Sequence, residues 1–153
     1  RFTGDVRLCF DADQAGISAT ERAIPLAQKA EVQLSIIDLS QTGAKDPDEL
    51  IHTDVHLWET ALSTKQYAVD WLIVQLQVAH DITSAVGKRN FTDIVLPTIA
   101  RLSDPVEKEH YINLIAELTS SSSEAIETKL GRQPKSSTLL KKSKKTLADY
   151  LAG

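Results

Sequence analysis

Apolar and polar positions follow two different rhythms over the first forty residues. Residues 6–10 (VRLCF) place apolar side chains at every second position and end at an acidic turn, which is typical of a short strand. Residues 15–30 carry apolar side chains at helical spacing, with Pro25 expected to kink this helix or break it in two. Residues 32–39 (VQLSIIDL) are rich in β-branched side chains and predict a second strand. This order predicts a βαβ unit with parallel strands and a right-handed connection.

Two parallel strands do not make a complete sheet. A parallel pair needs cover on both faces and neighbours along its edges. The first predicted strand also begins almost at the first residue of the chain. We therefore expect residues 1–55 to be the second half of an α/β domain whose first half is absent from the chain.

The pattern from Pro47 onward predicts helices. Residues 67–80 form an apolar-rich stretch, and residues 91–102 carry the apolar stripe of a core-facing helix. Residues 104–107 (DPVE) supply an N-cap acceptor, a proline at the first helical position and a glutamate at the third, so a helix should begin there. A capping box at residues 121–124 predicts a short last helix.

The predicted fold class is α/β followed by all-α, mostly helical overall. We expect three segments along the chain. Residues 1–55 form the half-domain, residues 56–131 form a helical bundle, and residues 132–153 form a basic linker and tail helix.

Composition narrows the class of protein. The 153 residues are 42% hydrophobic and 25% charged, which is typical of one globular domain or two small subdomains. No apolar stretch approaches the roughly 20 residues that a membrane helix needs. The single cysteine, Cys9, excludes an internal disulfide and favours a reducing compartment, so we expect a cytoplasmic protein.

The charge is distributed unevenly. Residues 1–128 hold 20 acidic and 10 basic side chains, whereas residues 129–153 hold seven basic side chains and one acidic one, Asp149. The basic end could contact nucleic acid or an acidic partner, although a solvated linker or helix face gives the same pattern.

Two aspartates frame the turn after the first predicted strand. Asp11 and Asp13 are two positions apart, so at a strand end their side chains leave on one face and repel each other unless a divalent cation lies between them. Hard carboxylate oxygens suit Mg²⁺ or Mn²⁺. A pair of aspartates in a loop or at a helix N-cap has the same spacing, so both interpretations stay open.

A second acidic segment, residues 45–49 (KDPDE), follows the second predicted strand. Because parallel strands end at the same edge of a sheet, Asp46 and Asp48 should face Asp11 and Asp13 there. The segment also suits a helix N-terminus, with Asp46 as N-cap and a proline at the first helical position. One backbone arrangement can serve both roles.

These two segments carry a resemblance to a known family. Residues 9–16 (CFDADQAG), together with residues 45–51 (KDPDELI), resemble the TOPRIM portion of the bacterial DnaG-type DNA primases. Shorter matches at residues 87–88 and 104–107 support it. The resemblance covers most of residues 5–130 and implies a partial TOPRIM fold, a Rossmann-like βαβ arrangement, followed by a helical bundle.

The resemblance implies an activity and a site. Such primases make short RNA primers on single-stranded DNA at the replication fork, by metal-dependent nucleotidyl transfer from nucleoside triphosphates. Asp11 and Asp13 match the family's metal-binding pair. Asp46 and Asp48 match further acidic residues of the same catalytic site, and the implied cofactor is Mg²⁺ or Mn²⁺.

The resemblance also implies what the chain lacks. The family's glutamate on an earlier strand is missing, as are a zinc-binding N-terminal domain and a basic subdomain that guides the template. We therefore expect the chain alone to be inactive. A DnaB-type replicative helicase would bind through a C-terminal domain that is absent here, with basic residues 141–145 in the tether toward it. No membrane partner is expected.

Two other functions stay open. A D-x-D motif after a hydrophobic strand also occurs in phosphotransferases of the haloacid dehalogenase kind, although Gln14-Ala15 and the KDPD loop disfavour this class. Alternatively, residues 56–131 could be a non-catalytic helicase-interaction module.

Four further side chains have a structural and a functional interpretation. His52 and His56 could bind zinc if they lie in a helix, but we expect them to be exposed loop residues. Trp58 and Trp71 could stack on nucleobases, but their place in patterned helices favours core packing.

Overall fold

The computed structural model describes residues 4–10, 13–40, 42–44 and 46–132. These residues form two compact units, one within residues 1–98 and the other beginning at Ile99. The boundary falls inside a single helix, α5 (Ala85–Ala100). In this described part of the chain, no helix is long and apolar enough to cross a membrane.

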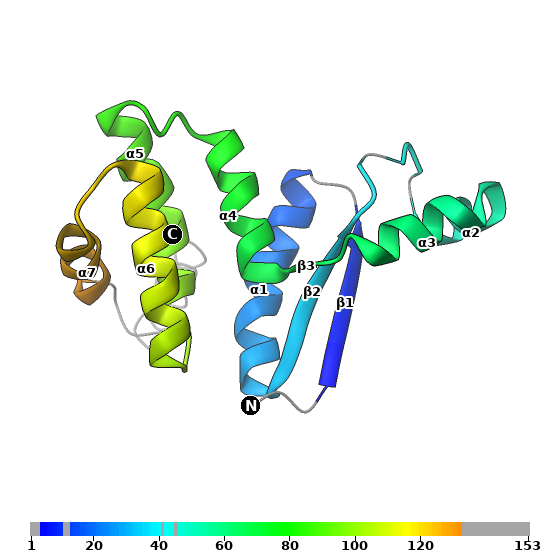
Figure 1. Ribbon diagram of the computed structural model, residues 1–153, viewed down its shortest axis with the longest axis horizontal. Coiled ribbons are helices and arrows are strands. Elements are labelled where there is room, and N and C mark those ends of the chain that lie inside the picture. Colours follow the sequence, from blue (N-terminus) through cyan, green and yellow to red (C-terminus); the bar gives the residue numbers. More distant parts are fainter. Residues whose placement is uncertain (1–3, 11–12, 41, 45, 133–153) are drawn as a thin grey trace, which may run out of the picture. The chain divides into compact units, whose positions relative to one another are not determined.

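The first unit begins with the predicted strand, helix and strand (Figure 1). β1 (Gly4–Phe10) and β2 (Val32–Asp38) are parallel and joined by α1 (Gln14–Lys29). Their register runs without interruption from Gly4↔Val32 to Phe10↔Asp38, so the two strands end opposite each other. The predicted βαβ unit with parallel strands is confirmed.

Pro25 lies inside α1 without breaking it. The helix is one element from Gln14 to Lys29, so the two separate pieces that the sequence allowed do not occur. Ile24 and Ala27 lie on either side of the proline and are both buried. Packing of these flanking turns holds the helix together, because tertiary contacts supply most of the stability of a helix in a protein.

A short third strand was not expected from the sequence. β3 (Gln66–Tyr67) pairs antiparallel with β2 through Ser35↔Tyr67 and Ile36↔Gln66, which makes the sheet mixed, in the order β1-β2-β3. Two residues are too few to show the alternating pattern of a strand. The sequence pattern places Tyr67 in the helix that follows, whereas the structure places it in β3. That helix, α4 (Ala68–Ala79), begins directly after the strand.

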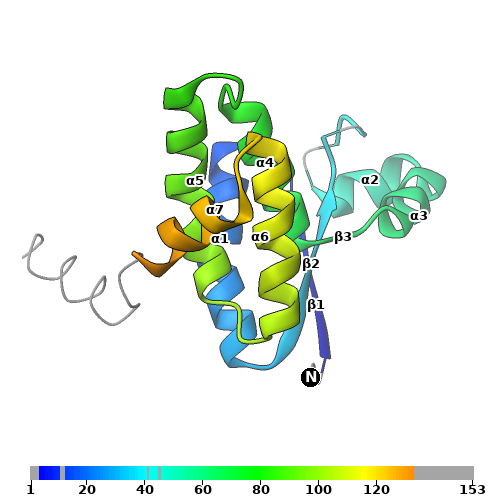
Figure 2. The ribbon, with the colours of Figure 1, turned by 60° about the vertical axis from the view of Figure 1, so that its left-hand side comes forward.

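Helices cover both faces of β2. α1 and α4 contact β2 and each other, and Leu34 lies with Ile24 and Ala68 on this side. α2 (Pro47–Thr53) and α3 (Val55–Ser63) contact each other, and α3 reaches β2 on the side of Ile37 (Figure 2). The two faces follow from the strand itself, because successive side chains point to opposite sides of a sheet.

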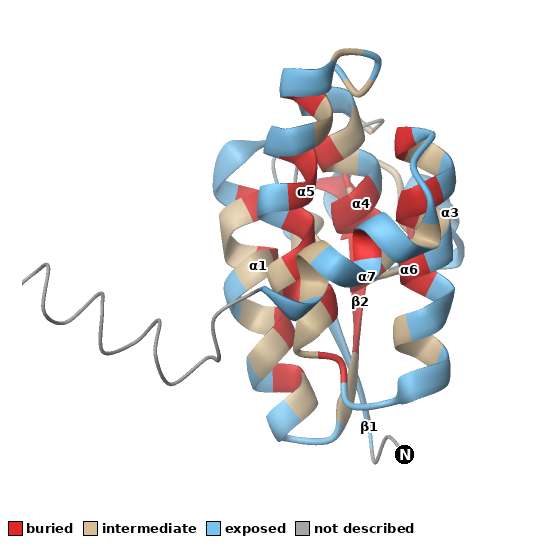
Figure 3. Ribbon diagram, turned by 90° about the vertical axis from the view of Figure 1, so that its left-hand side faces the viewer, coloured by how far each residue is buried: buried red, intermediate tan, exposed pale blue. Residues whose placement is uncertain are grey.

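The central strand is buried, whereas its neighbour is not. Leu34 to Ile37 are all at most 4% exposed, while Val6 on β1 is 43% exposed (Figure 3). This agrees with the apolar and β-branched side chains that dominate β2 and with the alternating pattern in β1.

Further helices follow α4 in the described part of the chain. α5 begins six residues before the predicted apolar stripe, and α6 (Pro105–Thr119) and α7 (Ser123–Gly131) belong to the second unit, where they pack together. Asp104 caps α6 by accepting a hydrogen bond from the Glu107 backbone N–H at 2.8 Å, as the DPVE segment predicted. The predicted tail helix within residues 132–153 lies, apart from Arg132, outside the described residues.

Candidate active site

The acidic segments follow the same edge of the sheet. β1 and β2 end at the register pair Phe10↔Asp38, so the chain leaves both strands at one edge (Figure 1). Asp13 follows the end of β1 by three residues, and Asp46 follows the end of β2 by eight. This edge is where open α/β sheets place their binding sites.

Asp13 and Asp46 are both helix N-caps. Oδ1 of Asp13 accepts a hydrogen bond from the Gly16 backbone N–H at 2.7 Å, at the start of α1. Oδ1 of Asp46 accepts one from the Glu49 backbone N–H at 2.8 Å, at the start of α2, with Pro47 at the first helical position. The capping interpretation is therefore confirmed for both residues. Each cap fixes the orientation of an exposed carboxylate.

Asp48 lies on the exposed surface of α2. Its Oδ1 is 3.6 Å from Nε2 of His52, one helical turn away. His56, on α3, lies 3.8 Å from a carboxylate oxygen of Glu59. Both histidines are exposed, as expected, but they lie in helices and not in a loop.

The donor chemistry of the edge suits a hard divalent cation, because its candidate ligands are all carboxylates. Among the described residues, however, no group of three histidine, cysteine or acidic side chains is close enough to hold a metal ion. Asp11 lies outside the described residues. A metal role for Asp11, Asp13, Asp46 and Asp48 therefore stays a prediction.

Asp38, the last residue of β2, is a functional candidate that the sequence pattern did not reveal. Its Oδ1 accepts a hydrogen bond from the Ser40 backbone N–H at 2.8 Å, and its Oδ2 accepts one from Nε1 of Trp71 at 3.2 Å. The one available signal is an aspartate directly after the apolar pair Ile36 and Ile37 at the end of the strand. Trp71 itself is 1% exposed, which confirms its place in the core.

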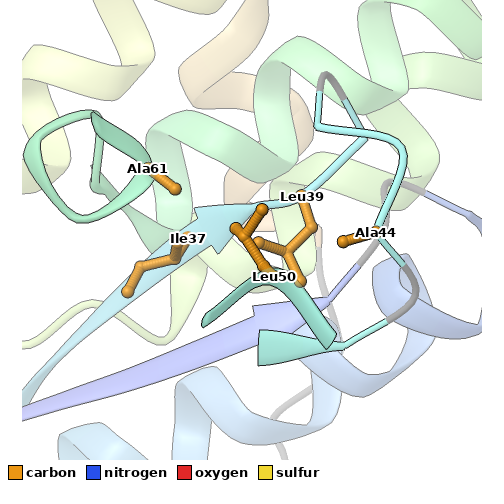
Figure 4. Close-up of a cluster of buried hydrophobic side chains, with 5 residues drawn as sticks. All are labelled: Ile37, Leu39, Ala44, Leu50 and Ala61. Carbon is orange, nitrogen blue, oxygen red and sulfur yellow. The ribbon is translucent and has the colours of Figure 1, made fainter. Parts of the chain in front are cut away.

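An apolar cluster lies beneath the acidic edge. Its buried members come from the end of β2, the loop after it, α2 and α3 (Figure 4), namely Ile37, Leu39, Ala44, Leu50 and Ala61. Cys9 and Trp58 pack against this cluster and are partly buried. The loop that ends at Asp46 is thus anchored by its own side chains.

A separate charged group lies at the opposite end of the strands. Asp5 on β1 accepts hydrogen bonds from Arg7 at 2.9 Å and from Lys65 at 3.4 Å, and Ser35 donates to its other oxygen at 3.3 Å. The Arg7 hydrogen bond, followed by that of Lys65, holds the pKa of Asp5 below its ordinary value. Because Asp5 is far along β1 from Phe10, this group is not part of the acidic edge.

Two family models match successive parts of the chain. A model described as "Toprim-like" matches residues 1–51, which include β1, α1 and β2. A model described as "DnaB-helicase binding domain of primase" matches residues 69–124, from α4 into α7.

Curated relatives and solved structures agree with these matches. The DNA primase of Synechocystis sp. is 32% identical over 118 residues, which are 72% of this chain and 18% of that protein. A DNA primase domain from Pseudomonas aeruginosa has a similar fold, with a TM-score of 0.65 and 21% identity, over 81% of this chain and 40% of that one. A DnaG primase catalytic domain bound to single-stranded DNA gives a TM-score of 0.62 and 20% identity, over 78% of this chain and 39% of that one.

The fold and the Toprim-like match over residues 1–51 place the chain in one class of protein. Its members have a Toprim-like sheet that is followed by helices, as in primase catalytic cores. Within that class, the resemblance to the DnaG-type DNA primases is confirmed, because both family matches and the relatives point to it. The chain spans about a fifth of the length of the curated relatives it matches.

The segment that matches the helicase-binding family model does not lie where the sequence predicts helicase binding. The resemblance implies helicase binding through a domain outside the chain, whereas the family model with that description matches residues 69–124, inside it. The match overlaps the segment 56–131 that was considered as an interaction module. The helical half of the chain is therefore a candidate partner-binding region in its own right.

Proposed function

We propose that the chain is part of a DNA primase, which synthesises short RNA primers on single-stranded DNA at the replication fork. One observation carries this proposal. A Toprim-like sheet with carboxylates at its carboxyl edge is followed, in the same chain, by a segment similar to the helicase-binding domain of primases. The haloacid dehalogenase alternative has no such support.

The proposed reaction is nucleotidyl transfer, in which a primer 3′-hydroxyl attacks the α-phosphate of an incoming nucleoside triphosphate. Asp11, Asp13, Asp46 and Asp48 would hold Mg²⁺ or Mn²⁺. The bound cation would lower the negative charge on the attacking and leaving oxygens. Asp13 and Asp46 would contribute by orientation, because each carboxylate is fixed on Oδ1 by its N-cap bond.

We also propose that the chain alone makes no primers. Its described carboxylates do not form a group of three that could hold a metal ion, so a working centre needs Asp11 and further ligands. The proposed partners are a single-stranded DNA template, nucleoside triphosphates and, through residues 69–124, a DnaB-type replicative helicase. A cytoplasmic location belongs to the same proposal.

The test measures primer synthesis by a full-length primase that contains this sequence. Asp46 and Asp104 make a matched pair, because each caps a helix that begins with proline and each accepts its cap bond at 2.8 Å. Asparagine caps a helix about as well as aspartate but carries no charge. Asp46→Asn should therefore lose most primer synthesis and raise the Mg²⁺ requirement, while Asp104→Asn should do neither.

Equal activity of Asp46→Asn and Asp104→Asn would show that Asp46 is only a cap. Full activity of an Asp11→Asn, Asp13→Asn double variant would contradict the proposed catalytic centre as a whole.

The helicase-binding match also favours a second candidate function, that of a non-catalytic helicase-binding module. Binding of the 153-residue chain to an immobilised DnaB-type helicase tests the interaction directly. Both functions predict binding by this chain. They differ in the full-length protein, where loss of primer synthesis on removal of the Asp11 and Asp13 charges supports the catalytic role, and unchanged synthesis supports the module.

A further inference from the structure

Asp38 joins helix α4 to the loop that leads to Asp46. Oδ2 of Asp38 accepts the indole N–H of Trp71 at 3.2 Å, and Oδ1 accepts the Ser40 backbone N–H at 2.8 Å. Both oxygens of this carboxylate therefore already receive a donor from the chain. Trp71 and Asp38 lie 33 positions apart, on either side of the α2–α3 segment.

The described part of the loop continues from Asp38 as a hydrogen-bonded turn. The Leu39 carbonyl accepts from the Thr42 backbone N–H at 2.9 Å and from the Thr42 hydroxyl at 2.7 Å. The Thr42 hydroxyl in turn accepts from the Ala44 backbone N–H at 3.2 Å. Leu39 and Ala44 are buried in the cluster that includes Leu50 of α2. The path from Asp38 thus reaches Ala44, two residues before Asp46.

Trp71 is a rigid anchor for this path. It is 1% exposed, and its neighbours on α4, Val69 and Leu72, are equally buried. α4 is held by contacts with both β2 and α1. An indole has a single N–H, and a buried N–H needs an acceptor, so the Asp38 bond fixes both the ring and the carboxylate.

We infer that Asp38 is a positioning residue for the acidic edge, anchored by Trp71. It holds the end of β2 and Ser40, from which the chain runs on to α2, and so sets where Asp46 and Asp48 are presented. This inference rests on the proposed primase function, since Asp46 and Asp48 are its proposed cation ligands. It also joins the two matched segments, because Asp38 lies within residues 1–51 and Trp71 within residues 69–124.

Two substitutions break the link in different ways. Trp71→Phe removes the indole N–H and keeps an aromatic ring in the core. Asp38→Asn leaves a single oxygen where two now accept hydrogen bonds, so at least one bond is lost. Trp58→Phe is the matched control, because Trp58 packs against the cluster beneath the same loop, and its substitution leaves the Asp38 carboxylate and both of its donors in place.

The first measurement is hydrogen exchange at the Ser40 amide in the 153-residue chain. Trp71→Phe and Asp38→Asn should both accelerate this exchange, and Trp58→Phe should not. The second measurement is the Mg²⁺ concentration for half-maximal primer synthesis in a full-length primase that contains this sequence. This concentration should rise about tenfold or more in the first two variants, because loss of a group that supports a metal ligand usually weakens metal binding by that much. It should change little in the control.

Unchanged exchange at Ser40 would overturn the anchoring role. Faster exchange with an unchanged Mg²⁺ requirement would overturn the positioning role, because the loop would then be held for stability alone. A wild-type protein that makes no primers would instead overturn the proposed function and the positioning of a cation site with it, while the exchange rates would still show whether Trp71 holds the loop.

Discussion

Asp13 and Asp46 occupy equivalent positions in two successive strand–loop–helix units. Each is an N-cap that follows a parallel strand, and each accepts on Oδ1 from the backbone N–H three residues later, at 2.7 Å and 2.8 Å. The strands that they follow end opposite each other, at the register pair Phe10↔Asp38. Local capping and a shared edge therefore give both carboxylates a defined orientation before any ligand is bound.

Substitution of Asp13 can separate its structural role from its charge. Asp13→Ala should lower the free energy of unfolding by about 1 kcal/mol, because the Gly16 N–H loses its acceptor. Asp13→Asn should change it by less than about 0.5 kcal/mol, since asparagine is an equally good cap. Urea denaturation of the two variants checks this. Equal losses in both would mean that the negative charge, and not the cap bond, stabilises α1.

Gly87 is required by the turn that begins α5. A Cβ atom there would lie 1.6 Å from the carbonyl oxygen of Asp81, which also accepts hydrogen bonds from Ser84. Gly87→Ala must open this turn, and we expect a loss of about 1–3 kcal/mol in the free energy of unfolding. Chemical denaturation measures the loss.

Gly131→Ala is the matched control for that substitution. Gly131 is the last residue of α7, and a Cβ atom there would meet nothing within 4 Å. This variant should be neutral or more stable by up to about 1 kcal/mol. A similar loss in both variants would show that the clash at Asp81 is not the cause.

Asp5 should make stability depend on pH in acid. Its hydrogen bonds with Arg7 and Lys65 lower the pKa of the Asp5 carboxyl group in the folded protein below the ordinary value. The stabilisation is therefore fully present above the ordinary pKa of about 4 and is lost as the pH falls through the lowered folded pKa. Asp5→Asn should be less stable than the parent at pH 6, by under about 1 kcal/mol for so exposed a pair, and this difference should shrink as the pH falls below about 4. Thermal unfolding across this range tests the convergence.

Glu21 should show the opposite dependence. Partial burial in α1 raises the pKa of its carboxyl group in the folded protein. Folding is then opposed by ionisation, so stability is greatest below the ordinary pKa and falls as the pH rises through the raised folded pKa. Glu21→Gln removes this loss, and its melting temperature should exceed that of the parent at pH 7 but not at pH 3. A parent that is more stable than the variant at pH 7 would contradict the burial effect.

Local patterns predicted the elements whose cause is local. The βαβ unit followed from the alternation in β1 and the β-branched run in β2. The caps at Asp46 and Asp104 followed from the D-P-x-E pattern that both segments share, in which side chain and backbone lie within one helical turn. These are interactions between residues three positions apart, so the sequence alone displays them.

Features that depend on distant partners were not predictable in this way. β3 exists because Gln66 and Tyr67 meet β2, and two residues carry no period. The Asp38–Trp71 bond joins residues 33 positions apart, and neither has a neighbour that marks it. Pro25 is tolerated because Ile24 and Ala27 are buried, which only the packed structure reveals. The convergence of four carboxylates on one cation stays a prediction, because Asp11 lies outside the described residues.

β1 is an edge strand, at which the sheet could be extended by another strand. In the described part of the chain it pairs on one side, with β2, while the opposite border of the sheet is the two-residue β3. A seven-residue strand with an open side offers evenly spaced amide and carbonyl groups to any extended segment that meets it. In a concentrated solution of the isolated chain, we therefore expect strands of this kind to pair edge to edge between copies, and dilution to reduce this self-association.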